Sequence, residues 1–380
     1  MQVPANLVPE MLSTARYASS SLLLVQAAGG NNSIKDVERN QLWVKASGVR
    51  LADVTEHKGM VPLRNSVIRS VVQNGDFESL PRSISHERSI RLTGEAVLDR
   101  TKGRPSLETG FHALLGDVVL HLHPVYVNAI TCMEKGAEFL ARLAPLPFSW
   151  VEYAAPGQEL AVKVDKAIQG RNVRSETVCV ALENHGFIAS GQTSDDVIRA
   201  TEAFLRVGQS VFGELSPDLY TPQPSPEGLE GAGNHLCSLL RERWGNESYL
   251  VRAARFGAFK RYACEPMVWN NPGPLVPDDV IFAGKGICVS ALSGLRDFVD
   301  RLERPPEKLA LAVEGLGTIL LARNEGLLVA MEETLLAHAL VRILVARQGC
   351  VHPLVASEVE YLQNMESEKY RISISSKGSA

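Results

Sequence analysis

The 380-residue sequence predicts an α/β protein, in which strands and helices pack together in layers. Two apolar runs rich in β-branched residues, 117–123 and 177–182, are typical of buried strands. Between them, residues 158–168 have the pattern of a helix. Ser194 is expected to cap a further helix, because apolar residues then recur at helical spacing. These are Val197, Ile198, Phe204, Leu205, Val211 and Phe212.

The rest of the N-terminal half continues this alternation. We expect helices over about 4–27, 62–74 and 106–115, a helix opened by Pro124, and strands over 41–45 and 187–190. Gly29, Gly30 and Gly75 are expected to end the first two helices. Ser106 is the expected N-cap of the third.

A linker is expected over 216–233, where prolines and glycines concentrate and apolar residues are few. We place the domain boundary there. The prediction is a catalytic domain over 1–225 and a smaller α/β domain over 234–380.

Composition excludes several classes of protein. The chain is 45% hydrophobic and 22% charged with a net charge of −4, so nothing indicates a nucleic-acid partner. Six cysteines without a Cys-x-x-Cys pair indicate reduced thiols, as in the cytoplasm. Leu22–Val25 is too short for a membrane span, and no export signal is evident. No glycine-rich nucleotide motif opens a helix, so no nucleotide cofactor is expected.

His121 and His123 lie at the end of the predicted strand 117–123. Side chains two apart on a strand share a face, roughly 7 Å apart at the backbone. Two neutral imidazoles so placed are ligands for a divalent transition metal. Taken alone, two buried core histidines would be the commoner interpretation.

His185 supplies a third imidazole. It follows the strand 177–182 in Asn184-His185-Gly186, where Asn and Gly both tolerate the positive φ of a sharp turn. Three histidines from two strands form the ligand set of a catalytic zinc, which keeps one position open.

Glu108 has two interpretations. An acid in the first turn of a helix is favourable against the helix dipole. Beside a metal, the same carboxylate is a general acid and base for carbon-bound protons. The three histidines favour the second interpretation.

These residues resemble the class II aldolase/adducin family, whose motifs occur here in the family's order. They are Gly30-Asn31, Ser47-Gly48, Ser106-Leu107-Glu108, His121-Leu122-His123 and His185-Gly186. The resemblance is closest to the aldolase part of bifunctional rhamnulose-1-phosphate aldolase/alcohol dehydrogenase proteins. It extends to Lys45–Gly48, Pro105–Thr109, Tyr153–Gly157, Glu358–Tyr361 and the basic stretch that ends near Arg371.

The resemblance implies a three-layer α/β/α sandwich around a mostly antiparallel sheet, assembled as a homo-oligomer, often a tetramer. It implies one zinc ion on His121, His123 and His185, with Glu108 as the catalytic acid and base. Asn31, Ser47, Gly48 and Ser106 would hold the substrate phosphate. Leu107 stands where the monofunctional aldolases have a second serine, so a sugar acid remains open as substrate.

The implied reaction is the metal-dependent retro-aldol cleavage of a ketose phosphate, similar to rhamnulose 1-phosphate, into a dihydroxyacetone-phosphate-type fragment and an aldehyde. A sugar-phosphate dehydratase is an open alternative. The 4-epimerases carry Asp at the position of Glu108, which favours an aldolase over them. A non-catalytic adducin-like interaction module is disfavoured because all three histidines are present.

The second half contains a possible repeat. Val180–Ile188 can be laid on Leu311–Ile319, and a helix follows at equal distance in each. His185 then falls on Leu316, so a copy over 309–345 of residues 177–213 would lack the ligand. A degenerate repeat and a chance likeness both remain open.

Overall fold

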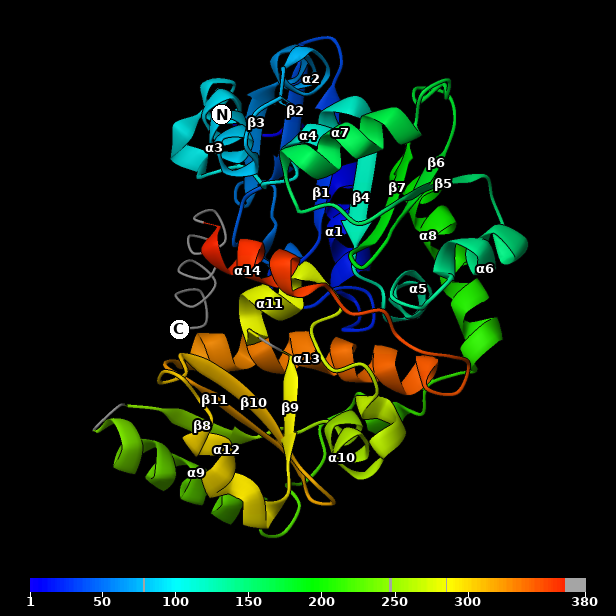
Figure 1. Cartoon of the computed structure of the whole chain (residues 1–380). Helices are drawn as coiled ribbons and strands as arrows, with labels where there is room; N and C mark the ends of the chain where they lie inside the picture. Colours follow the sequence, from blue (N-terminus) through cyan, green and yellow to red (C-terminus); the bar gives the residue numbers. More distant parts are fainter. Residues whose placement is uncertain (78, 246–247, 285, 366–380) are drawn as a thin grey trace. The chain divides into compact units, whose positions relative to one another are not determined.

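The computed structural model describes residues 1–77, 79–245, 248–284 and 286–365 (Figure 1). The basic stretch near Arg371 lies outside them. The chain folds into two compact units. Unit 1 comprises Met1–Thr131 and Lys135–Gln209, and unit 2 comprises Cys132–Glu134 and Ser210–Ala380. No described helix is both long and apolar enough to span a membrane.

Unit 1 is built on a seven-stranded sheet of order β3-β2-β1-β4-β7-β6-β5. Its strands are β1 (Asn31–Asp36), β2 (Gln41–Lys45), β3 (Met60–Arg64), β4 (Val118–Leu122), β5 (Phe148–Val151), β6 (Val178–Leu182) and β7 (Gly186–Gly191). All neighbouring strands are antiparallel except β5 and β6, which are parallel. The α/β class is therefore confirmed, and the expected mostly antiparallel sheet is mixed at this edge.

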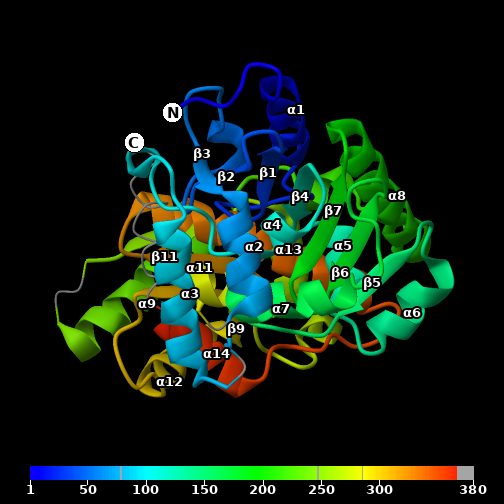
Figure 2. The ribbon, with the colours of Figure 1, turned by 90° about the horizontal axis from the view of Figure 1, so that it is seen from above.

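Helices cover both faces of this sheet (Figure 2). They are α1 (Val8–Ser19), α2 (Asn65–Asn74), α3 (Arg82–Glu95), α4 (Thr109–Leu114), α5 (Val125–Thr131), α6 (Gly136–Leu143), α7 (Gln158–Ala167) and α8 (Ser194–Phe212). On one face, α2, α4 and α7 pack together over a core that includes Val119, Val180 and Ile188. On the other face, α1 and α5 contact the strands, and Phe204 of α8 packs on Phe187.

Three predicted helices in unit 1 differ from the structure. The first spans only Val8–Ser19, because the hydroxyls of Ser19 and Ser20 bond to preceding carbonyls at its end. Residues 62–74 divide into β3 and α2, with Pro62 on an edge strand, where its missing N–H is tolerated. The third helix begins at Thr109 rather than next to Ser106, so Glu108 stands at its N-cap.

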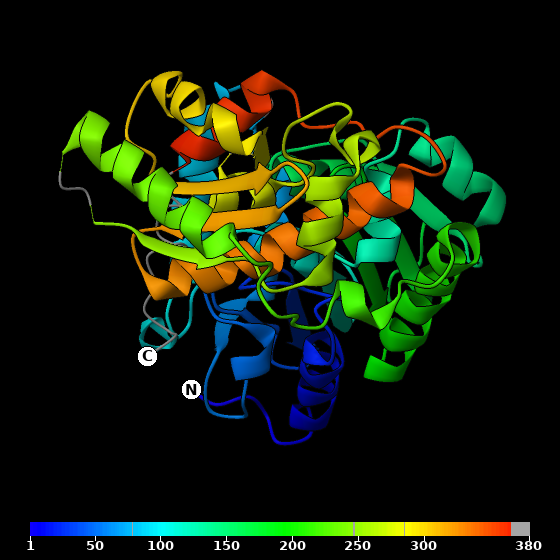
Figure 3. The ribbon, with the colours of Figure 1, turned by 90° about the horizontal axis from the view of Figure 1, so that it is seen from below.

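Unit 2 has a four-stranded sheet of order β8-β11-β10-β9. Its strands are β8 (Leu250–Ala253), β9 (Ile287–Ser290), β10 (Lys308–Val313) and β11 (Gly317–Ala322). Its helices are α9 (Leu229–Trp244), α10 (Gly257–Cys264), α11 (Pro277–Ala283), α12 (Leu295–Asp300), α13 (Glu325–Val345) and α14 (Ala356–Asn364). In Figure 3, α9 overlies this sheet, and α10 and α13 contact β11.

The linker predicted over 216–233 is only partly irregular. The change from unit 1 to unit 2 falls at residues 209 and 210, within α8. The predicted linker contains a short 3₁₀ turn, Pro217–Leu219, and α9 already begins at Leu229. Leu229 is buried in the core of unit 2, which explains why the helix begins inside a glycine-rich stretch.

Candidate metal centre

His121 and His123 are positioned by β4, which lies between β1 and β7 in the sheet of unit 1. His121 is the fourth residue of the strand, opposite Asn31 of β1 and Ile188 of β7. His123 follows the end of the strand. Their side chains share a face, as the alternation of a strand requires.

His185 lies at the corner between β6 and β7. Its amide donates to the Leu182 carbonyl at 3.2 Å, and Asn184 takes the positive φ of 50° that the turn needs. Gly186 is required here for a second reason. A Cβ at this position would lie 2.4 Å from the Leu122 carbonyl oxygen and 2.9 Å from the His123 ring. Glycine therefore allows the corner to approach β4 closely.

The three imidazoles form one buried cluster. One nitrogen of each ring lies within 4.8 Å of the corresponding nitrogens of the other two. The Nε2 atoms of His121 and His123 are 3.1 Å apart. The rings of His121 and His185 have centroids 5.1 Å apart. The predicted ligand residues are thus brought together.

The protonation of His121 suits a metal ligand. Burial lowers its pKa well below the ordinary value, more than the nearby Glu108 raises it, so the ring is neutral. Nδ1 donates to the Phe187 carbonyl oxygen at 3.1 Å. This tautomer leaves the lone pair of Nε2 facing the cluster.

Glu108 faces the same cluster from the start of α4. Its Oε1 lies 3.2 Å from His185 Nε2, and its Oε2 lies 3.5 Å from His121 Nε2. Burial raises the pKa of this carboxyl group, but His121 and His185 outweigh burial and hold the pKa well below its ordinary range. A buried carboxylate beside imidazole nitrogens fits a divalent cation.

Asn31 and Ser106 adjoin Glu108. The Asn31 amide donates to Glu108 Oε2 at 2.7 Å and to Ser106 Oγ at 3.1 Å. His112, which the sequence analysis missed, orients this amide. Its Nε2 donates to Asn31 Oδ1, and Nδ1 accepts from Ser33 Oγ at 2.7 Å. Burial lowers the pKa of His112 to about 3, so the ring stays neutral.

Ser47 and Gly48 lie on the loop that follows β2. The Ser47 amide donates to the Arg104 carbonyl at 2.9 Å, and Ser106 donates back to the Lys45 carbonyl at 3.0 Å. This pairing brings the Ser47–Gly48 loop beside the segment that carries Ser106. The amine of Lys45, buried and also not predicted as a site residue, binds the carbonyls of Ala28 and Val49. It thereby ties two of the loops together.

The sequence of unit 1 matches a known family over nearly its whole length. The family model described as "Class II Aldolase and Adducin N-terminal domain" matches residues 10–209. The chain belongs to this family. Family members are metal-dependent aldolases and related proteins, consistent with a buried group of three histidines.

Individual relatives of the family are more distant. The chain is 26% identical over 221 residues to the uncharacterized oxidoreductase YuxG of Bacillus subtilis (strain 168), which covers 56% of this chain. The match spans only 30% of that relative's length.

Two solved structures match the same half of the chain. The N-terminal class II aldolase domain of a conserved protein from Thermoplasma acidophilum is 21% identical, with a TM-score of 0.46, over 53% of this chain and 92% of that one. An L-fuculose 1-phosphate aldolase is 20% identical, with a TM-score of 0.38, over 56% of this chain and 90% of that one.

Proposed function

We propose that this protein is a zinc-dependent aldehyde-lyase that cleaves a ketose phosphate, similar to rhamnulose 1-phosphate, into a dihydroxyacetone-phosphate-type fragment and an aldehyde. The observation that carries the proposal is the convergence of three buried imidazoles with Glu108. An adducin-like interaction module would have no need for such a cluster. Membership of the class II aldolase and adducin family supports the same chemistry.

His121, His123 and His185 are the proposed metal ligands. Burial keeps the His121 ring neutral, which avoids competition between a proton and the metal. A bound divalent ion would supply Lewis-acid stabilisation of the negative charge that develops on the ketose oxygen. Three protein ligands leave a coordination position open, as a catalytic site needs.

Glu108 is the proposed acid and base. Breaking the C3–C4 bond converts the C4 hydroxyl into an aldehyde, which releases the hydroxyl proton, and leaves the electron pair on C3, which must take up a proton. The Glu108 carboxylate would first accept a proton and, as the carboxylic acid, deliver it to C3, so that one proton is released and one is consumed; in the reverse reaction the carboxylate removes the proton from C3. The hydrogen bond from Asn31 holds the carboxylate in one orientation.

Asn31, Ser47, Gly48 and Ser106 are the proposed phosphate-binding residues. Pairing of Lys45–Ser47 with Arg104–Ser106 supports this role, because it places two hydroxyls and a glycine on adjacent loops. Asn31 already donates to Ser106 and Glu108. It would therefore connect the proposed phosphate site with the catalytic carboxylate.

A screen of ketose phosphates and sugar acids tests the proposal, with release of an aldehyde as the readout. We expect cleavage of at least one ketose phosphate, loss of activity after chelation, and recovery with zinc. Chelator-resistant cleavage, or epimerisation or loss of water without aldehyde release, would contradict a metal-dependent aldolase. The last two outcomes would assign an epimerase or a dehydratase.

A further inference from the structure

We propose that unit 2 is a copy of the C-terminal half of unit 1 that has lost the metal ligands, and that a pocket beside the former metal position binds a small polyhydroxylated anion, such as a sugar acid or a sugar phosphate. The inference concerns unit 2 alone. It does not depend on the proposed aldolase activity.

The order of elements is the same in both regions. Strand β4 is followed by α5, α6, β5, α7, β6, β7 and α8, and strand β8 by α10, α11, β9, α12, β10, β11 and α13. The sheet order β8-β11-β10-β9 repeats β4-β7-β6-β5. A helix precedes the first strand in each region, α4 in one and α9 in the other.

Strand registers agree as well. Val118 pairs with Gly191 where β4 meets β7, and Leu250 pairs with Ala322 where β8 meets β11. The last pairs also correspond at the parallel edge, since Val151 pairs with Leu182, and Ser290 with Val313. If the two strand-turn-strand units were alike only by chance, a third strand would not be expected to lie parallel to each unit in the same register, as β5 and β9 do.

The corner that carries His185 has a counterpart at Leu316. The Leu316 amide donates to the Val313 carbonyl at 2.9 Å, as the His185 amide donates to Leu182 at 3.2 Å. The residue before each takes a positive φ, 50° at Asn184 and 73° at Gly315. The ligand is replaced by an apolar side chain on the same backbone.

The other ligands are also replaced. His121 pairs with Ile188 in unit 1, and Ala253 pairs with Ile319, the counterpart of Ile188, in unit 2. Ala253 therefore stands at the position of His121, and Arg255, two residues later, at that of His123. A Cβ on Gly186 would meet the His123 ring, and a Cβ on Gly317 would instead lie 2.8 Å from a methyl of Leu229. Leu229 thus packs against Gly317, as the His123 ring packs against Gly186.

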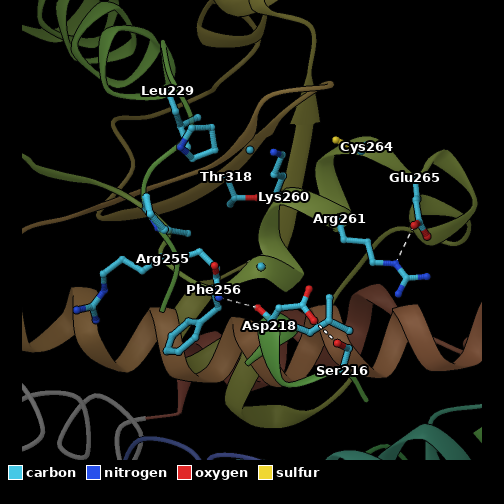
Figure 4. A pocket seen from close by; sticks show the side chains of 17 residues that line it. Ser216, Asp218, Leu229, Arg255, Phe256, Lys260, Arg261, Cys264, Glu265 and Thr318 are labelled. Atoms are coloured by element: carbon cyan, nitrogen blue, oxygen red, sulfur yellow. Dashed lines mark hydrogen bonds and ion pairs between the residues drawn. The ribbon is translucent and has the colours of Figure 1, made fainter. Parts of the chain in front are cut away.

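A pocket of about 640 Å³ remains beside this position (Figure 4). Its size lies in the usual range for small-molecule sites, about 300–1,000 Å³. It is bounded by the end of β8, the start of β11, α10 and the segment 216–229. Hydrogen-bonding groups of Ser216, Gln223 and Thr318 line it, and they suit the hydroxyls of a sugar.

One cation of the lining is available to an anion. Of the three cationic residues that line the pocket, two already pair with carboxylates. Arg255 binds the buried Glu332 at 2.6 Å, and Arg261 binds Glu265 at 2.7 Å. Lys260 has no acidic partner within the described residues. Asp218 accepts from Ser216 and is a suitable acceptor for ligand hydroxyls (Figure 4).

Cys264 offers a native reporter, because its exposed thiol lines the pocket. Cys350 is exposed outside the pocket lining and serves as the internal control. The full-length protein is alkylated with iodoacetamide in the presence of gluconate, inorganic phosphate, sorbitol or serine, and each thiol is followed by peptide mass spectrometry. Gluconate at ten times its Kd should slow alkylation of Cys264 by about tenfold and leave Cys350 unchanged.

Substitution of Lys260 tests whether binding in the pocket requires its positive charge. Lys260→Ala should abolish the protection, while Arg301→Ala, which removes an exposed cation of unit 2 outside the pocket, should preserve it. Several outcomes would overturn the proposal: no protection by either anion, equal protection by neutral sorbitol or zwitterionic serine, or protection that survives Lys260→Ala. Protection by phosphate alone would overturn the polyhydroxylated class.

Discussion

At the scale of single residues, two hydrogen bonds connect Glu108, the proposed catalytic acid, to the neutral ring of His112 through Asn31. Glu108 is fixed by Asn31, and Asn31 is fixed by His112. The two rings His112 and His121 have lowered pKa values chiefly through burial, so both remain neutral near the centre. The proposed metal ligands are thus separate from the residues that orient the carboxylate.

Glu108→Gln tests the proposed proton transfer. The amide keeps the shape of the carboxylate but cannot take a proton, so metal content should stay near that of the parent. Turnover should fall by roughly 10²–10⁴-fold. The two measurements are elemental analysis and the rate of aldehyde release. Cleavage at the parental rate would rule out Glu108 as the acid and base.

His112→Ala tests the orienting contact. It removes the donor to Asn31 Oδ1 and the acceptor for Ser33, which leaves buried polar groups without partners. The free energy of unfolding should fall by about 1–3 kcal/mol. Turnover should also fall while the metal is retained, and His112→Gln should restore part of it because its amide can donate to Asn31. Full activity in His112→Ala would show that Asn31 needs no such support.

The sequence predicted the residues that the structure brings together at the candidate centre, but not the side chains that support them. His121, His123, His185 and Glu108 could be found because each stands in a local motif. His112 lies 81 positions from Asn31 in the chain, and the two residues meet only once α4 packs on the sheet that contains β1. No local pattern contains such a contact. The one available signal was its position, one helical turn after Glu108.

At the scale of elements, the end of α4 depends on two buried or partly buried cations of unit 1. Lys35 of β1 binds the carbonyls of Leu115 and Gly116, and Arg69 of α2 binds those of Ala113 and Leu114. Carbonyls at the end of a helix lack partners within the helix, and cations there also favour its dipole. Burial, followed by the nearby Arg69, lowers the pKa of Lys35 from 10.5 to about 7.

This shift predicts a pH dependence of stability. Between pH 7 and 10.5, the unfolded chain binds a proton at Lys35 that the folded chain has partly released. The free energy of unfolding therefore gains a contribution that rises with pH across this window. Lys35→Met should lack that rise. Urea unfolding of both proteins at several pH values measures the difference, and parallel curves would contradict the lowered pKa.

Strands were predicted more accurately than helices. The runs 41–45 and 177–182 agree with β2 and β6 within a residue, because their apolar, β-branched composition is local. Helix α3 (Arg82–Glu95) was missed, since Ser89 is its only buried residue and no apolar stripe marks it. The division of 62–74 into β3 and α2 depends on pairing with β2, which a local pattern cannot contain.

At the scale of the whole molecule, a unit that matches the class II aldolase and adducin family continues into a second α/β unit with the strand order of its own C-terminal half. The expected division into domains over 1–225 and 234–380 stays a proposal. The sequence placed the boundary later in the chain than the change from unit 1 to unit 2, because it relied on prolines and glycines. The last part of that proline- and glycine-rich segment is helical and buried in the core of unit 2.

Metal analysis tests the central claim, that three buried histidines make one metal centre. The purified protein should contain about one divalent ion per chain, as the three-ligand set requires. His185→Ala should lose the ion while unfolding remains cooperative, and His235→Ala, which removes an exposed histidine of α9, should retain it. An unchanged metal content in His185→Ala, or a parent protein that binds no divalent ion, would contradict the account.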